Sequence, residues 1–185
     1  MLSPNTANAD GCSALCQIEG PQESDELMPG TVASVRRLRF VKVNTRPAAG
    51  YHLPGVGSDP LVHGATLRLF DSNAGPAGAG SVEYALRAAG WKGLGTAEGA
   101  SGFAYRGGAS DPCRAVLITI HGLRIFCRGA AMTLNPPFTG DLAVNLTLGT
   151  ASKRYCARFG GTTIKNEVAY MKRTESPAPM SCPGP

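Results

Sequence analysis

Cysteine is the residue type in this 185-residue chain whose number and spacing most clearly indicate chemistry. Of the six cysteines, two lie in an acidic N-terminal segment and four lie beside turn residues in the C-terminal half. An even number of widely spaced cysteines is typical of a disulfide framework, which requires an oxidising compartment. Several connectivities are open; we favour Cys113–Cys127 and Cys156–Cys182, and we predict an extracellular or cell-surface location.

No other group of residues matches a catalytic or metal-binding pattern. The sequence lacks a G-x-S-x-G nucleophile elbow, an H-E-x-x-H zinc motif and a G-x-x-x-x-G-K-[ST] phosphate loop. His52, His63 and His121 are isolated in turn-like segments, so a hydrolytic triad with Asp59 or Asp111 would have to assemble in space. We predict a non-enzymatic protein with no cofactor and no metal site, and keep a cryptic hydrolase as the second alternative.

The aromatic residues allow two interpretations. Trp91 is the single tryptophan, and together with Tyr84 and Tyr105 it could form a ligand platform on which sugar rings stack. A lone tryptophan flanked by glycines, here Gly90 and Gly93, more often fills a hydrophobic core. We therefore expect Trp91 to be buried, and keep a carbohydrate-binding module that uses this platform as the first alternative function.

Charge is unevenly distributed along the chain. Residues 1–30 contain five acidic residues and no Lys or Arg, so they carry −5, and because the whole chain carries +5, residues 31–185 carry +10. A basic body favours anionic partners, and we consider an anionic polysaccharide or a cell-envelope polymer. The densest basic stretch, Arg36–Lys42, is expected to be a solvated strand face. No nucleic-acid-binding module accompanies it, so we predict no specific nucleic-acid partner.

The sequence gives no direct signal for export or for membrane insertion. No window of about 18 apolar residues exists, so no transmembrane segment is predicted. The first residues lack the basic and apolar regions of a signal peptide. Because disulfides need an oxidising compartment, we expect that Met1 is not the natural start and that the export signal lies upstream.

From residue 35 onward, apolar and polar residues alternate. Runs at 66–69, 82–87 and 142–148 place an apolar side chain at every second position and end at turn residues, which is typical of half-buried antiparallel strands. About eight short strands predict an all-β fold, an antiparallel β-sandwich or jelly-roll-like domain. We expect further strands at 36–43, 102–106 and 153–158, and a short helical turn at 164–172.

The segment that joins Cys113 to Cys127 is expected to be a β-hairpin. Residues 113–120 are apolar on both faces, His121-Gly122 follows, and residues 123–127 return. A two-residue X-Gly loop places the turn at 121–122. In that register Cys113 and Cys127 are not directly opposite, so their disulfide requires a bulge or a displacement of Cys113 from the Asp111-Pro112 turn.

Two resemblances add to this interpretation. The segment Asp10-Gly11-Cys12-Ser13, followed by Cys16 and Ile18-Glu19, resembles the end of the myxococcal-type cysteine-rich repeat of secreted and surface proteins. The upstream half of that repeat is missing, so the pairing of Cys12 and Cys16 stays open, and a chance C-x-x-x-C is the alternative.

Residues 35–183 resemble an uncharacterised C-terminal domain of large secreted proteins of myxobacteria and related lineages. The resemblance rests on short segments, of which the last is the most specific: Gly57-Ser58-Asp59-Pro60, Gly90-Trp91-Lys92-Gly93, Asp111-Pro112-Cys113 and Tyr155-Cys156-Ala157-Arg158-Phe159-Gly160-Gly161. The family has no assigned activity, so the resemblance implies only a location and an architecture.

These observations predict three parts. Residues 1–20 are expected to be a disordered remnant of the repeat, 21–34 an acidic linker, and 35–185 the disulfide-stapled β-sandwich. The expected function is that of a non-enzymatic structural, display or adhesion module of a secreted or cell-surface bacterial protein.

Overall fold

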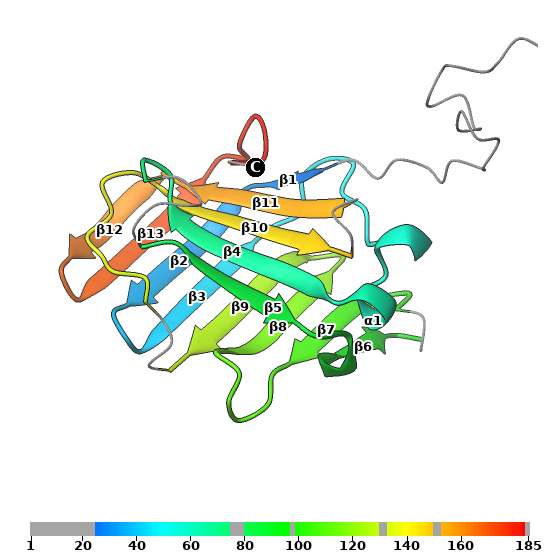
Figure 1. The fold of residues 1–185 in the computed structure, drawn as a ribbon. Coiled ribbons are helices and arrows are strands. Elements are labelled where there is room, and N and C mark those ends of the chain that lie inside the picture. The colour runs from blue at the N-terminus through cyan, green and yellow to red at the C-terminus, as the bar shows by residue number, and fades with distance from the viewer. Residues whose placement is uncertain (1–24, 75–79, 97–98, 130–132, 150–152, 184–185) are drawn as a thin grey trace, which may run out of the picture.

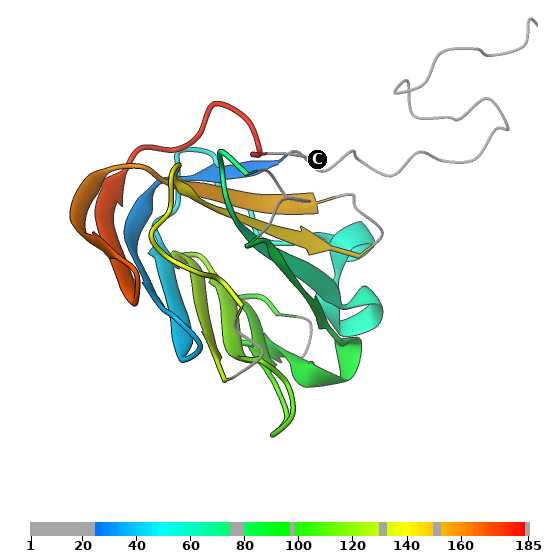
Figure 2. The same ribbon diagram turned by 60° about the vertical axis from the view of Figure 1, so that its left-hand side comes forward.

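The computed structural model describes residues 25–74, 80–96, 99–129, 133–149 and 153–183. They form an all-β protein in which two sheets pack face to face, as the sequence predicts (Figure 1). Figure 2 shows the two sheets from the side, with the larger sheet curving below the smaller one. The predicted N-terminal stub, including Cys12 and Cys16, lies outside the described residues.

The larger sheet has eight antiparallel strands in the order β12-β13-β2-β3-β9-β8-β7-β6. Hairpins connect most of its neighbours, and the sheet spans nearly the whole sequence because β2 pairs with the C-terminal β13. In sheet order the strands are Thr162–Glu167, Tyr170–Ser176, Gly30–Arg36, Phe40–Thr45, Gly122–Arg128, Cys113–Thr119, Gly102–Arg106 and Trp91–Leu94.

The smaller sheet has five strands in the order β1-β11-β10-β4-β5, and β1 pairs with β11 in parallel. In sheet order the strands are Glu26–Met28, Lys153–Phe159, Leu142–Leu148, Ala65–Asp71 and Val82–Leu86. One short α-helix, α1 (Pro60–His63), and two 3-10 turns, Val56–Ser58 and Ala88–Gly90, lie between strands. No helix in the described ranges has the length and apolar character needed to cross a bilayer.

The core lies between the two sheets. Every second residue of the central strands points inward and is fully buried, for example Val41, Ile125 and Val116 in the larger sheet and Leu67 and Val144 in the smaller one. This is the alternation that the sequence shows, because successive side chains of a strand point to opposite faces. The other half of each strand therefore forms one of the two outer faces.

The prediction of an acidic linker at 21–34 is wrong for its second half, residues 26–34, which forms strands. Residues 26–28 form β1 and residues 30–36 form β2, so the domain begins about ten residues before the predicted boundary at residue 35. Glu26, which made this segment look solvated, is buried and pairs with Lys153 from the other end of the chain. Because the partner lies so far away in the sequence, no local pattern around Glu26 indicates that this residue is buried.

Two other local predictions are also wrong. The strand expected at 36–43 is interrupted by a turn at 37–39, where Leu38 adopts a positive φ of 53°. The helical turn expected at 164–172 is instead the hairpin of β12 and β13, with Glu167 opposite Tyr170. Both segments are rich in polar residues. Because few apolar residues mark the alternation there, the sequence pattern does not distinguish a strand from a turn.

Both predicted disulfides, Cys113–Cys127 and Cys156–Cys182, are present. The 113–127 hairpin forms, but its turn is at Ile120-His121, one residue earlier than predicted, with Thr119 opposite Gly122. A register shift between Cys113 and Ala115 then brings Cys113 opposite Cys127. A bulge in the hairpin therefore makes the disulfide possible, as its sequence spacing required.

Candidate functional site

The three aromatic residues of the predicted ligand platform are core residues. The exposed fractions of Trp91, Tyr84 and Tyr105 are 6%, 8% and 2%. The indole nitrogen of Trp91 donates a hydrogen bond to the carbonyl of Leu86 at 3.2 Å, and its ring lies 5.4 Å from that of Tyr105. These rings face the interior between the sheets, so the platform prediction is wrong and the expected burial of Trp91 is confirmed.

The aspartates and histidines considered for a triad do not contact one another. The Asp59 carboxylate accepts the backbone N–H of Leu61 at the start of α1, and the Asp111 carboxylate accepts the N–H of Gly108 in a turn. Within the described residues, neither forms a hydrogen bond or ion pair with a histidine, and no three His, Cys, Asp or Glu residues converge as metal ligands would. In the part of the chain that the structure describes, Asp59, Asp111 and the histidines therefore do not assemble into the hydrolytic triad considered from the sequence.

The Asp71 carboxylate, at the end of β4, holds together the loop that follows β4 and the loop that precedes β10. It accepts backbone N–H groups of Asn73, Thr139 and Gly140 at 3.0, 2.7 and 2.8 Å and also the Thr139 hydroxyl. Burial alone would raise the pKa of Asp71, but these hydrogen bonds together lower it below its ordinary value. Asp71 therefore has a structural role.

A buried ion pair fixes β1 to the smaller sheet. The Lys153 ammonium lies 2.6 Å from the Glu26 carboxylate, and the side chains are 3% and 6% exposed. Burial, and secondarily the negative charge of Glu26, raise the pKa of the neighbouring Tyr51. An open hollow of about 520 Å³ lies beside Tyr51 and His52. The charges of Glu26 and Lys153 nearby neutralise each other, so this pair offers no net charge to a ligand.

The outer face of the eight-stranded sheet is different, because its charges are of one sign. We call it the basic face and define it by three rows of residues that lie opposite one another on successive strands. The rows are Lys165-Lys172-Ser34-Lys42-Phe126-Ala115-Arg106, Thr162-Thr174-Val32-Asn44-Arg124-Leu117-Ala104-Lys92 and Glu167-Tyr170-Arg36-Phe40-Arg128. They contain eight Lys or Arg residues and one acidic residue, Glu167.

The cations of the basic face are almost all unpaired. Lys165 forms an ion pair with Glu167 at 3.1 Å. Among the described residues, the other seven cations form no ion pair, whereas four arginines elsewhere each meet an acidic partner: Arg68, Arg154, Arg158 and Arg173. All four lysines other than the buried Lys153 belong to this face. Unpaired like charges at such density attract anions and repel one another.

A shallow groove of about 350 Å³ lies at the centre of the basic face. The groove crosses β3, β9 and β8, and its hollow arises where the short side chain of Ala115 stands opposite the larger Phe126. The side chain of Phe126 is 39% exposed, which is unusual for an aromatic residue at the middle of a sheet. The lining residues are Lys42, Asn44, Ala115, Leu117, Arg124, Ile125 and Phe126.

Sequence reasoning identified only part of this site. Arg36 and Lys42, from the predicted basic stretch, lie on the basic face, whereas Arg37 and Arg39 lie in the turn. The groove residues on β8 and β9 were not singled out. The signal available was the placement of Lys or Arg at the outward positions of several separate strands, which becomes a patch only after the strand order is known.

Comparisons with known proteins do not assign this face a role, since no family model, no curated protein and no solved structure gives a significant match.

Proposed function

We propose that this chain is a non-enzymatic adhesion or display module of an extracytoplasmic protein, and that its basic face holds an anionic polysaccharide or envelope polymer. The observation that carries the proposal is the seven unpaired cations, which lie in rows across one sheet face. A linear polyanion can contact cations on successive strands, which are spaced about 4.8 Å apart. No comparable array of unpaired charge occurs on the outer face of the five-stranded sheet in the described residues.

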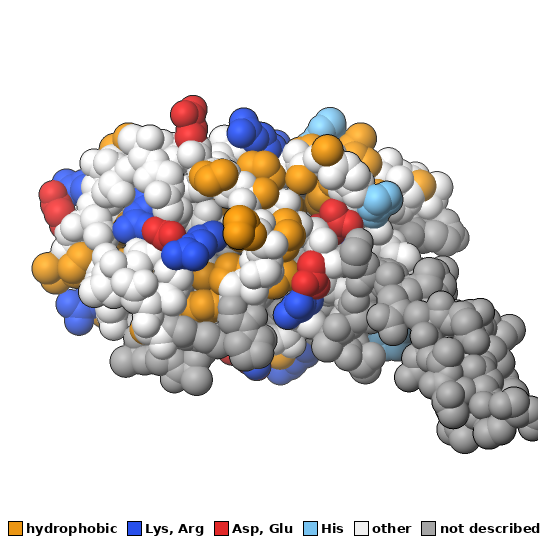
Figure 3. Space-filling model, turned by 90° about the horizontal axis from the view of Figure 1, so that it is seen from above, with side chains coloured by type: hydrophobic (Ala, Val, Ile, Leu, Met, Phe, Trp, Pro, Cys, Tyr) orange, Lys and Arg blue, Asp and Glu red, His pale blue; other side chains and the backbone are white. Residues whose placement is uncertain are grey.

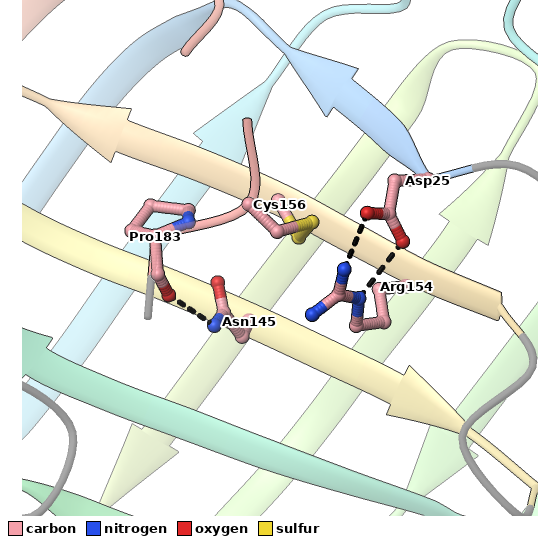
Figure 4. Close-up of a disulfide and its surroundings, with 6 residues drawn as sticks. Asp25, Asn145, Arg154, Cys156 and Pro183 are labelled. Carbon is pink, nitrogen blue, oxygen red and sulfur yellow. Dashed lines mark hydrogen bonds and ion pairs between the residues drawn. A yellow bond between two sulfur atoms is a disulfide. The ribbon is translucent and has the colours of Figure 1, made fainter. Parts of the chain in front are cut away.

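The arrangement of the chain ends supports a display role. Asp25 and Pro183, near the two ends of the described chain, bond to Arg154 and Asn145 on the outer face of the five-stranded sheet (Figure 4). That face is opposite the basic face, so the described ends leave the basic face uncovered. The two disulfides support an oxidising, extracytoplasmic setting.

A charge-reversal pair tests the proposal. Lys42→Glu changes the charge at the centre of the basic face by −2, and Arg68→Glu makes the same change on the five-stranded sheet. We expect Lys42→Glu to weaken retention on an immobilised anionic polysaccharide by about tenfold or more at low salt, because a central attraction becomes a repulsion. Raising the salt should release the wild-type protein, because screening weakens the attraction.

Arg68→Glu should be retained nearly as well as the wild type. Equal losses for the two variants would show that only net charge matters, and unchanged retention of Lys42→Glu would contradict the proposal.

A further inference from the structure

The groove on the basic face has properties that charge alone does not explain. A surface used only for electrostatic attraction needs no exposed aromatic ring and no hollow. Here Phe126 is exposed between two cations, and Ala115 and Leu117 give the groove an apolar floor. Pockets with an apolar wall and a few convergent polar groups are typical of small-ligand recognition.

The polar groups of the groove converge on one position. Lys42 lies opposite Phe126, and Arg124 lies two residues from Phe126 on the same face of β9. Lys42 and Arg124 are therefore diagonal neighbours, about 7–8 Å apart at the backbone, which is within reach of two long side chains. Both can contact one anionic group, while Asn44, opposite Arg124, offers an amide donor and acceptor for hydroxyl groups.

The spacing along β9 favours a particular ligand. Alternate side chains of a strand stand about 7 Å apart. A six-membered sugar ring that packs on Phe126 would place a carboxylate bonded directly to that ring beside Arg124. The planar guanidinium binds a planar carboxylate with two parallel hydrogen bonds, whereas lysine acts as a point charge. The C–H face of a sugar ring is apolar and suits an aromatic wall.

We infer that the groove is a subsite for one carboxylated sugar residue, a uronate unit, of an acidic polysaccharide. The inference rests on the proposed function and specifies its ligand. A single-stranded nucleic acid fits less well, because such ligands stack successive bases on a series of aromatic side chains. Among the described residues, Phe126 is the one aromatic residue that lines the groove.

The test compares three polymers of different chemistry: polygalacturonate, dextran sulfate and poly-dT. For Phe126→Ala we expect affinity for polygalacturonate to fall about tenfold, and affinity for dextran sulfate to change by less than about twofold. Arg124→Lys keeps the charge but removes the guanidinium fork, and we expect a selective loss for polygalacturonate of about fivefold. Val62→Ala, which shortens an exposed apolar side chain of α1 outside the basic face, is the control and should bind all three polymers as the wild type does.

The outcomes separate the inference from the proposed function. Wild-type protein that binds none of the polymers contradicts both. Protein that binds all three equally, with no selective loss in Phe126→Ala or Arg124→Lys, leaves the basic face as a general anion-binding surface and overturns the uronate subsite. Stronger binding of poly-dT that is lost in Phe126→Ala overturns it in favour of nucleic acid. Thermal unfolding of each variant checks that it remains folded.

Discussion

The outer faces of the two sheets are built by the same strand alternation but use charge in opposite ways. On the five-stranded sheet, basic residues meet acidic partners, as in Arg154–Asp25 and Arg158–Asp141. Figure 3, seen from above, shows basic and acidic side chains next to one another on that side of the molecule. On the eight-stranded sheet, seven cations have no acidic partner among the described residues. A surface that serves only solubility does not require such segregation.

The two outer faces also differ in how they are covered. The segment before the C-terminus crosses the five-stranded sheet, where the Cys156–Cys182 disulfide and a hydrogen bond from the Asn145 side chain to the Pro183 carbonyl hold it (Figure 4). Asp25 binds Arg154 with two hydrogen bonds on the same face. The described residues cover this face with their own chain and leave the basic face open, so we expect the first to contribute stability and propose the second as the binding surface.

Two lysines show how differently a buried, paired charge and an exposed, unpaired charge contribute to stability. Lys153→Met should lower the free energy of unfolding by about 3–5 kcal/mol, because it leaves the buried Glu26 carboxylate without its partner. Lys42→Met, at an exposed and unpaired cation, should change it by less than about 0.5 kcal/mol. Denaturant unfolding measures both values.

The double variant Glu26→Leu with Lys153→Met removes both buried charges and should recover most of the loss. A loss as large in Lys42→Met as in Lys153→Met would remove the distinction between the two kinds of charge.

Trp91 tests whether the aromatic residues belong to the core or to a binding surface. Trp91→Ala should cost about 3–5 kcal/mol, because it leaves a cavity between the sheets. The tryptophan emission of the wild type should be blue-shifted, protected from quencher and unchanged by added polysaccharide. Quenchable, red-shifted emission that responds to a glycan would place a second binding surface at this edge of the sandwich.

Acid titration gives a smaller effect. The pKa of Asp71 is lower in the folded protein than the ordinary value of about 3.9 in the unfolded chain. The ionised carboxylate therefore stabilises the fold fully above about pH 4, and this contribution is lost as the pH falls toward the folded pKa.

Asp71→Asn should cost about 1–3 kcal/mol at neutral pH, because hydrogen bonds to a charged acceptor are weakened. Its stability should decline less than that of the wild type between about pH 5 and pH 2. Parallel declines in the two proteins would contradict a structural role for the ionised form.

The sequence predicted the sandwich and both disulfides because these depend on local patterns. The alternation in Leu142–Leu148 and the hairpin between Cys113 and Cys127 can both be recognised without knowledge of the strand order. The position of β1 could not be predicted in this way, because Glu26 is buried by a lysine that lies 127 residues away in sequence.

The candidate site depended still more on strand order. Lys172, Lys42 and Arg106 come from distant parts of the chain and share a row only because β13, β2, β3, β9, β8 and β7 are neighbours. Phe126 looks like another buried residue of an apolar strand in the sequence. Its exposure follows from the alternation along β9, in which Ile125 and Cys127 point into the core and Phe126 points outward.

Chemical footprinting tests the central claim that one sheet face carries the binding. Lysine and arginine residues are modified with and without an acidic polysaccharide, and each site is quantified by peptide mass spectrometry. We expect the polymer to protect Lys42, Lys172 and Arg124 several-fold, while Arg68 on the five-stranded sheet reacts equally in both samples. Equal protection of Arg68, or no protection of the three residues on the basic face while the polymer is bound, would contradict that claim.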